Sequence, residues 1–444
     1  MPTKVGFVSL GCPKNLVDSE VMLGILKDSG FEITSKEENA DVLIVNTCGF
    51  IEPAKEESIR HILELAKYKE AGKCKVLVVA GCLAQRYSSE LLEEMPEIDA
   101  LVGPEHVQEI SDIVNKALGQ ERISHISEPQ FIYNEHLPRL LSTPHYTAYV
   151  KVAEGCDNRC AYCAIPDIRG KFRSRPIESI EVEVKNLVAK GVKEVILIAQ
   201  DTTRYGLDLY GKYSLDILLN RLGKVTGLRW IRIMYCYPNR FTNELIDIIA
   251  ETPTICKYID LPIQHASDKI LSAMGRPVNQ EQIRSLVKDL RKKIPGVVLR
   301  TSFIVGFPGE SENDFQELLA FMKEMKFDRA GVFTYSQEEG TPAATMTDQI
   351  SDDVKQERYH RAMSLQKDIA LAHNQARIGQ VLEVLVEELV EGSRNIYIGR
   401  SSLDAPEIDG TVEFSSPREL SVGDIVKVTI NRALEYDLMG ELAQ

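Results

Sequence analysis

The sequence lacks any apolar run of the roughly 18 residues that a membrane-spanning helix requires, and its first apolar stretch is too short for a secretory signal. We therefore expect a cytoplasmic protein with no membrane partner. Basic residues are also scarce, with 52 Lys and Arg against 66 Asp and Glu and a net charge of -14. This balance disfavours a protein that holds nucleic acid mainly through its phosphates, although a local basic patch is still compatible with it.

The nine cysteines do not suggest a disulfide framework, because their number is odd and no signal peptide precedes them. Three of them, Cys156, Cys160 and Cys163, fall within eight residues. Thiolates are the usual ligands of iron–sulfur clusters, which normally take four. A local set of three leaves one iron open to a substrate. Ordinary loop cysteines and part of a zinc site are the alternatives, but no further Cys or His lies nearby to complete four zinc ligands.

The region around this motif alternates between apolar strands and amphipathic helices. A strand-like run precedes the motif, and five further runs end at Gln200, Tyr235, Ile263, Phe307 and Tyr335. Helical patterns such as 177–190 and 280–293 separate these runs. The alternation predicts βαβ units and a parallel sheet of six strands. Ligands bind at the carboxyl ends of the strands in such sheets.

A second set of cysteines follows three strands in the first 110 residues. The runs VGFVSLG, DVLIVNT and VLVVAG lead to Cys12, Cys48 and Cys82. Continuous apolar runs of this kind are typical of central strands in a parallel sheet. Because the carboxyl ends of such strands share one edge, we expect the three thiols to meet there and hold a second iron–sulfur cluster. The alternative is that tight strand–helix turns favour small residues. The three remaining cysteines are expected to pack in the interior.

The pattern changes from about residue 375, where short β-rich stretches occur at 381–386, 396–400, 410–414 and 424–430. Closely spaced strands predict a small antiparallel β-barrel. The polar, proline-punctuated segment 127–144 is the expected first linker, and a helical stretch at 354–374 is the expected bridge to the barrel. The predicted fold class is α/β, with a doubly wound N-terminal domain (1–126), a second parallel α/β domain (144–374) and the terminal barrel (375–444).

The CxxxCxxC spacing of the first set resembles the signature of the radical S-adenosylmethionine superfamily. The resemblance implies a partial (β/α)6 barrel and a 4Fe–4S cluster whose open iron binds S-adenosylmethionine. One electron then cleaves the sulfonium to methionine and a 5′-deoxyadenosyl radical, which abstracts hydrogen from carbon. Residues near the last ligand and at two strand ends are the implied cofactor contacts, with ordinary strand-end roles as the alternative: Tyr162, Gln200, Asp201, Arg300, Ile304 and Gly306. Glu310 belongs to the same loose pattern, in which Ser302 replaces a glycine.

Two three-cysteine sets, one split over an α/β domain and one of CxxxCxxC type, resemble the methylthiotransferase family. The resemblance implies two 4Fe–4S clusters, a sulfur-donating one on the N-terminal cysteines and a radical-generating one on the others. S-adenosylmethionine serves twice, as methyl donor and as radical source, with an external one-electron reductant. The resemblance to this family also implies that the terminal barrel is a TRAM domain, an OB-like barrel that usually binds RNA. No catalytic residue is expected beyond the cluster cysteines, because hydrogen abstraction needs no acid–base pair.

The family has two main branches, one that modifies an adenosine of transfer RNA (MiaB-like) and one that modifies an aspartate of a ribosomal protein (RimO-like). Here Cys12 precedes Pro13-Lys14-Asn15, where the transfer-RNA branch typically has Gln-Met-Asn. The loop 403–410, LDAPEIDG, also resembles the ribosomal-protein branch. From residue 377 onward the chain carries 13 acidic and six basic residues, a charge that repels RNA and attracts a basic protein.

These features favour the ribosomal-protein branch. The resemblance to this branch implies a reaction that replaces a β-carbon hydrogen of one aspartate in small-subunit ribosomal protein twelve by a methylthio group, on the free protein or the assembled subunit. A monomer is the default expectation, and modification of a transfer-RNA adenosine is the alternative function. The basic residues after the motif, Arg169, Lys171, Arg173 and Arg175, resemble the same branch in context but are expected to be a solvated charged run.

Overall fold

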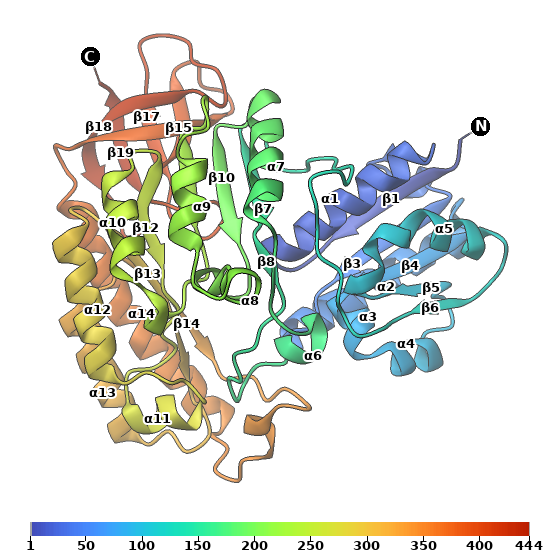
Figure 1. Ribbon diagram of the computed structural model, residues 1–444, viewed down its shortest axis with the longest axis horizontal. Helices are drawn as coiled ribbons and strands as arrows, with labels where there is room; N and C mark the ends of the chain where they lie inside the picture. The colour runs from blue at the N-terminus through green and yellow to red at the C-terminus, as the bar shows by residue number, and fades with distance from the viewer. Residues whose placement is uncertain (1, 444) are drawn as a thin grey trace.

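The computed structural model describes residues 2–443 and contains two parallel sheets followed by a small barrel. Figure 1 shows the N-terminal sheet on one side, the second sheet with its layer of helices on the other, and the barrel (red) against one end of the second sheet. Within 2–443, no helix is both long enough and apolar enough to cross a membrane. The predicted α/β class and the order of the three parts are confirmed.

The N-terminal sheet has six parallel strands in the order β2-β1-β3-β4-β5-β6. Its central strands β3 and β4 are buried along their whole length, because helices cover both faces. The strand order reverses between β1 and β3, and ligands bind at the carboxyl edge beside such a point. The elements are β1 Lys4–Ser9, α1 Pro13–Asp28, β2 Glu32–Thr34, β3 Val42–Thr47, α2 Glu52–Ala71, β4 Val76–Gly81, α3 Cys82–Arg86, α4 Ser88–Glu94, β5 Ala100–Val102, α5 Ile110–Leu118 and β6 Ile123–His125.

The second sheet also has six parallel strands, but their spatial order β7-β10-β11-β12-β13-β14 follows the chain. A sheet wound in one direction places its crossover helices on one face, and β7 and β14 form its two edges, so the predicted partial (β/α)6 barrel is confirmed (Figure 1). The strands are β7 Thr147–Lys151, β10 Glu194–Ile198, β11 Trp230–Ile233, β12 Ile255–Asp260, β13 Val298–Val305 and β14 Arg329–Thr334; a short hairpin pairs β8 Ala153–Glu154 with β9 Arg173–Ser174.

Two of the helices around this sheet begin with a reciprocal capping box. Asn279 caps α12 with Gln282 in a reciprocal capping box, and Ser311 caps α13 with Asp314 in the same way. Their apolar faces cover the main hydrophobic core. The helices are α6 Ile165–Arg169, α7 Ile177–Ala189, α8 Leu207–Tyr210, α9 Leu215–Leu222, α10 Asn243–Glu251, α11 Asp268–Ala273, α12 Gln280–Lys293, α13 Glu312–Met325 and α14 Asp352–Gln375.

The segment 127–144 joins the two sheets without a helix or strand of its own. It is nevertheless anchored, because the Tyr133 hydroxyl donates a hydrogen bond to Asp18 of α1. Arg139 forms ion pairs with Glu20 of α1 and Glu183 of α7. This expected linker therefore fastens α1 to the second sheet.

The terminal barrel is closed by five strands in the order β15-β16-β17-β19-β18. The four predicted stretches all form strands. The fifth strand, β19, pairs antiparallel with β18 and parallel with β17. Its sequence LMGEL gives a poor strand signal because it is short and has a central glycine. The strands are β15 Val381–Leu389, β16 Ile396–Ser401, β17 Val412–Ser415, β18 Ile425–Ala433 and β19 Leu438–Leu442.

Candidate functional site

The N-terminal cysteines lie at one edge of the first sheet. Cys12 precedes α1, Cys48 directly follows β3, and Cys82 is the first residue of α3 after β4. Gly11 has a φ of +88°, and a Cβ there would lie 2.9 Å from the Cβ of Cys48. Glycine at this position therefore lets the loop that carries Cys12 approach Cys48 closely.

Burial and charge act differently on these three thiols. Burial raises the pKa of Cys48 to about 12 and also raises that of Cys82. Burial opposes ionisation of Cys12 too, but the cations of Lys14 and Arg169 and the first N–H groups of α1 outweigh it and lower its pKa. The thiolate, and not the thiol, binds metal, and a helix N-terminus favours the thiolate. Cys12 is thus the thiol of this set that the protein prepares most strongly for ligation.

The CxxxCxxC loop lies beyond β8 and is held by backbone hydrogen bonds. The Cys156 N–H donates to the Gly170 carbonyl at 3.0 Å, and the Cys163 N–H donates to the Cys160 carbonyl at 3.1 Å. Burial raises the pKa of both Cys156 and Cys163. Arg276, which no motif in the sequence indicates, places Nη1 3.9 Å from the Cys160 sulfur and 3.4 Å from the Tyr162 hydroxyl.

The predicted cofactor contacts fall into separate surroundings. Tyr162 and Ile304 belong to one small apolar cluster beside the CxxxCxxC loop. Gln200 donates from its amide to Glu154. Asp201 is fully buried, accepts a 2.7 Å hydrogen bond from Asn158 and forms an ion pair with Arg240. The structure therefore places Asp201 in the support of the loop that carries Cys156 and Cys160.

The predicted contacts on β13 also differ in what surrounds them. The Arg300 guanidinium lies 2.7 Å from Asp260 at the end of β12 and 3.7 Å from Asp409 of the terminal barrel. Its charge is thus matched by protein carboxylates. Beyond the strand, the Gly306 and Phe307 N–H groups both donate to the Glu310 carboxylate. Glu310 therefore holds the turn that follows β13.

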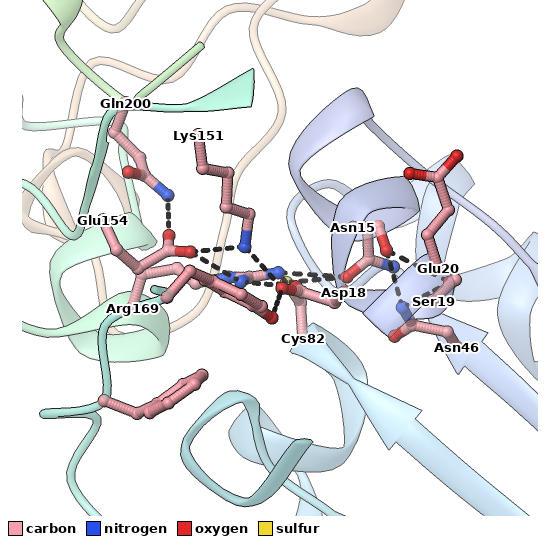
Figure 2. A network of polar contacts seen from close by, with 12 residues as sticks. Asn15, Asp18, Ser19, Glu20, Asn46, Cys82, Lys151, Glu154, Arg169 and Gln200 are labelled. Atoms are coloured by element: carbon pink, nitrogen blue, oxygen red, sulfur yellow. Dashed lines mark hydrogen bonds and ion pairs between the residues drawn. The ribbon is translucent and has the colours of Figure 1, made fainter. Parts of the chain in front are cut away.

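Between the two cysteine sets lies a buried group of charges that Figure 2 shows at close range, here called the cysteine seam: Asp18, Lys151, Glu154 and Arg169. Arg169 of α6 points toward α1, where Nη1 lies 2.7 Å from Asp18 Oδ2 and Nη2 lies 3.0 Å from Asn15 Oδ1. The same Nη2 donates to the Cys82 sulfur at 3.3 Å. Lys151 pairs with both Asp18 and Glu154.

The cysteine seam corrects the expectation of a solvated charged run. Arg169 and Arg175 are each only 2% exposed, and Arg175 pairs with Glu183 at 2.5 Å. Lys171 alone of the four is exposed, and Arg173 is half-buried. No periodic pattern in the sequence indicates this burial, because the two arginines lie in a short helix and a loop. Asp18 and Cys82, the partners of Arg169, are far away in the chain, whereas Arg175 pairs with Glu183 only eight residues further on.

The two cysteine sets fit iron–sulfur ligation by their donor chemistry. All nine cysteines are free thiols. Each set offers three sulfurs at a loop or helix start, with backbone N–H groups acting on Cys12, Cys156 and Cys163. Hydrogen bonds and cations next to cluster sulfurs are the usual means by which a protein tunes a cluster. Arg169 at Cys82 and Arg276 near Cys160 supply one such cation to each set.

Comparison with known proteins agrees with this arrangement. Residues 4–103 match the uncharacterized protein family UPF0004, residues 150–322 the radical SAM superfamily, and residues 378–443 the TRAM domain. "Ribosomal protein uS12 methylthiotransferase RimO" of Desulforamulus reducens is 71% identical over 445 residues, covering all of both chains. The protein of the same name from Heliobacterium modesticaldum is 54% identical, over 99% of this chain and 95% of that one.

Solved structures show the same fold at much lower identity. The radical S-adenosylmethionine methyltransferase TsrM from Kitasatospora setae, solved with cobalamin and a [4Fe-4S] cluster, superposes with a TM-score of 0.57 at 14% identity. The match covers 86% of this chain and 81% of that one. The cobalamin-dependent radical enzyme OxsB, with a TM-score of 0.51 at 11% identity, covers 83% of this chain and 56% of its own.

Proposed function

The chain belongs to the family of ribosomal protein uS12 methylthiotransferases, and from that premise we propose that it replaces a β-carbon hydrogen of one aspartate in that ribosomal protein by a methylthio group. As a radical S-adenosylmethionine enzyme it uses an iron–sulfur cluster and S-adenosylmethionine. The observation that carries the proposal is the full-length identity to uS12 methylthiotransferases, and it favours this function over modification of transfer RNA.

Six cysteines are the proposed ligands of two 4Fe–4S clusters, Cys12, Cys48 and Cys82 for the N-terminal one and Cys156, Cys160 and Cys163 for the radical one. When bound, the clusters and S-adenosylmethionine supply the electron, the radical, the sulfur and the methyl group. The chain itself orients these groups and excludes water. Arg169 and Arg276 hold cations against the two sulfur sets, and Gln200 and Glu154 link the end of β10 to the cysteine seam. The proposed S-adenosylmethionine contacts are Tyr162, Gln200, Asp201, Arg300, Ile304 and Gly306.

The proposed partner is uS12, free or in the small subunit, together with an external one-electron reductant, and the proposed enzyme is a cytoplasmic monomer. The acidic charge of the terminal barrel supports this partner. From residue 377 onward, 13 acidic residues stand against six basic ones. A basic ribosomal protein is attracted to such a surface, whereas an RNA backbone is repelled. The proposed domain limits are 1–126, 144–374 and 375–444.

The test is an anaerobic reaction of the protein reconstituted with iron and sulfide. Small subunits, free uS12 and transfer RNA are offered in parallel with S-adenosylmethionine and a reductant. Mass spectrometry then locates any methylthio group. We expect it on one aspartate of uS12, and a methylthio group on a transfer-RNA adenosine instead would overturn the proposed substrate.

The second cluster is tested with matched cysteine variants. Cys82→Ala is expected to abolish methylthio transfer and to lower bound iron from about eight atoms to about four, because one cluster of four irons is lost. Reductive cleavage of S-adenosylmethionine should persist. Cys256→Ala is the control, because Cys256 is buried in the packing of the second sheet. Unchanged iron content and turnover in Cys82→Ala would contradict the N-terminal cluster.

A further inference from the structure

Lys14 is a buried lysine without a partner. It is 8% exposed, and within residues 2–443 no hydrogen bond or ion pair reaches its Nζ. Its ammonium instead lies 3.3 Å from the centre of the Tyr235 ring. Lysine is rarely buried unless it is paired, because the charge loses its hydration without compensation. The Cys12 thiol is the charge that acts most strongly on this ammonium. In the proposed function that thiolate is taken up by the cluster, so the ammonium has no hydrogen-bonded anion of its own and is open to one from outside the chain.

The position of Lys14 is at the junction of the two sheets. It stands in the first turn of α1, two residues after Cys12. Tyr235, beneath its ammonium, follows β11 and has a φ of +62°, which is unusual for a bulky residue. The Tyr235 N–H donates to Asp260 Oδ2 at 2.9 Å, which holds this conformation at the end of β12. The ammonium thus lies over the carboxyl ends of β11 and β12, where barrels of this class bind their ligands.

The carboxylates nearest to Lys14 are already paired with other groups. Glu154 is held by Lys151, Arg169 and Gln200. Asp260 is held by Arg300 and by the Tyr235 N–H. Burial lowers the pKa of Lys14, and Glu154 and Asp260 are both close enough to oppose this shift. Their hydrogen bonds, however, are made with the other groups just named and not with the Lys14 ammonium. The resident carboxylates therefore leave the ammonium without a direct counter-ion.

We propose that Lys14 binds the side-chain carboxylate of the target aspartate and so positions its β-carbon between the two cysteine sets. This inference rests on the proposed function, which brings an aspartate to this junction. The reacting β-carbon of aspartate is bonded directly to its carboxylate, so a charge that fixes the carboxylate also fixes the carbon. The Nζ carries three donors on a flexible stem and suits an anion that enters from solvent. Lys14 is on this account a positioning and specificity residue.

The test is a double-mutant cycle between enzyme and substrate. Lys14→Met keeps the length of the side chain and removes its charge. The substrate change replaces the target aspartate of uS12 by asparagine. Dissociation constants for uS12 are measured with the cluster-loaded full chain. For the wild-type enzyme we expect the asparagine substrate to bind about 10- to 100-fold more weakly, the range for losing a hydrogen bond between charged groups. For Lys14→Met we expect equally weak binding of both substrates.

Two further measurements separate this role from a structural one. If Lys14 only stabilises the Cys12 thiolate, Lys14→Met will change the iron content or the cluster spectrum. It will then also weaken the binding of the aspartate and asparagine substrates by the same factor, and the asparagine substrate will still bind more weakly than the aspartate one. That result overturns the proposal. Lys27→Met, an exposed position near the end of α1, is the matched control and should leave binding unchanged. Wild-type protein that does not modify uS12 would refute the proposed function itself. Wild-type protein that modifies uS12 without coupling to Lys14 would refute this inference alone.

Discussion

Two of the buried groups of charges that join the second sheet to its neighbours differ in what they touch. The cysteine seam joins it to the N-terminal domain and ends on the sulfur of Cys82. The second group, here called the barrel seam, joins it to the terminal barrel and consists of Glu194, Arg232 and Arg400. Both are built from basic side chains and carboxylates at a few per cent exposure. Burial and ion pairing therefore do not by themselves distinguish a functional charge from a structural one.

Their position along the strands does distinguish them. Glu194 is the first residue of β10, so the barrel seam lies at the amino ends of the parallel strands. Lys151 ends β7, and Glu154 lies in β8 beside the CxxxCxxC loop, so the cysteine seam lies at the carboxyl ends. In barrels of this kind the carboxyl ends carry chemistry and the amino ends carry stability. We expect changes in the barrel seam to act on folding and changes in the cysteine seam to act on the clusters.

The largest expected effect on stability comes from breaking the barrel seam. Glu194 accepts from Arg400 at 2.5 Å and from Arg232 at 3.0 Å, and all three side chains are almost fully buried. Glu194→Gln leaves the buried Arg232 guanidinium without an anion and leaves Arg400 with only the Glu387 carboxylate at 3.2 Å, which we expect to cost about 3–5 kcal/mol of unfolding free energy. Urea denaturation measures the loss. Bound iron per folded chain should not change, because the cysteine sets are at the other end of the strands.

A matched control lies on the same interface. Glu383 pairs with Arg229 at 3.3 Å, but both side chains are about half exposed. Glu383→Gln should therefore lower the unfolding free energy by only about 0–1 kcal/mol. Equal losses in Glu194→Gln and Glu383→Gln would mean that burial does not set the strength of the barrel seam. Loss of iron in Glu194→Gln would mean that the two seams are coupled.

The next effect is a pH dependence of the barrel seam. Burial raises the pKa of Glu194, but Arg400 and Arg232 outweigh it and lower the pKa from 4.5 to about 2. Because the folded pKa is depressed, the stabilisation is complete above the unfolded value and is lost as the pH falls from about 4.5 toward 2. The shift corresponds to about 3 kcal/mol. In urea titrations at decreasing pH, the difference between wild type and Glu194→Gln should shrink over this window, and a constant difference would contradict it.

The sequence predicted the sheets well because they depend on local pattern. The apolar runs before Cys12, Cys48 and Cys82 are β1, β3 and β4, and helix 280–293 has the predicted limits. Three-residue strands such as β5 and β6 were missed, because each is too short to show a period. The spatial order of the strands in each sheet could not be predicted from local pattern either, because it depends on which strands pair across the fold.

The surroundings of the cysteines were less predictable for the same reason. The two cysteine sets could be read from spacing and from strand ends. Arg169 could not, because its partners Asp18 and Cys82 are 151 and 87 residues away in the chain. Arg276 likewise approaches Cys160 from 116 residues away. Long-range pairs of this kind become visible only once the fold places α1, α3 and α6 together. The ligand assignments themselves stay predictions until the clusters are measured.

The smallest expected effect comes from a change in the cysteine seam and is a shift in the reduction potential of the N-terminal cluster. Arg169→Lys keeps the positive charge between Asp18 and Glu154 but removes the planar fork that reaches Cys82. A donor to a cluster sulfur stabilises the reduced, more negative state, so its loss should lower the reduction potential of the N-terminal cluster. A bond of about 1.5 kcal/mol corresponds to about 60 mV for one electron. Potentiometric titration followed by electron paramagnetic resonance measures the shift. Arg173→Lys is the control: Arg173 is half-buried at the start of β9, four residues after Arg169, and donates to backbone carbonyls, so its change should leave the potential unaltered. An equal shift in both variants would assign the effect to the general charge of the loop, and the contrast between a seam that reaches sulfur and one that does not would then fail.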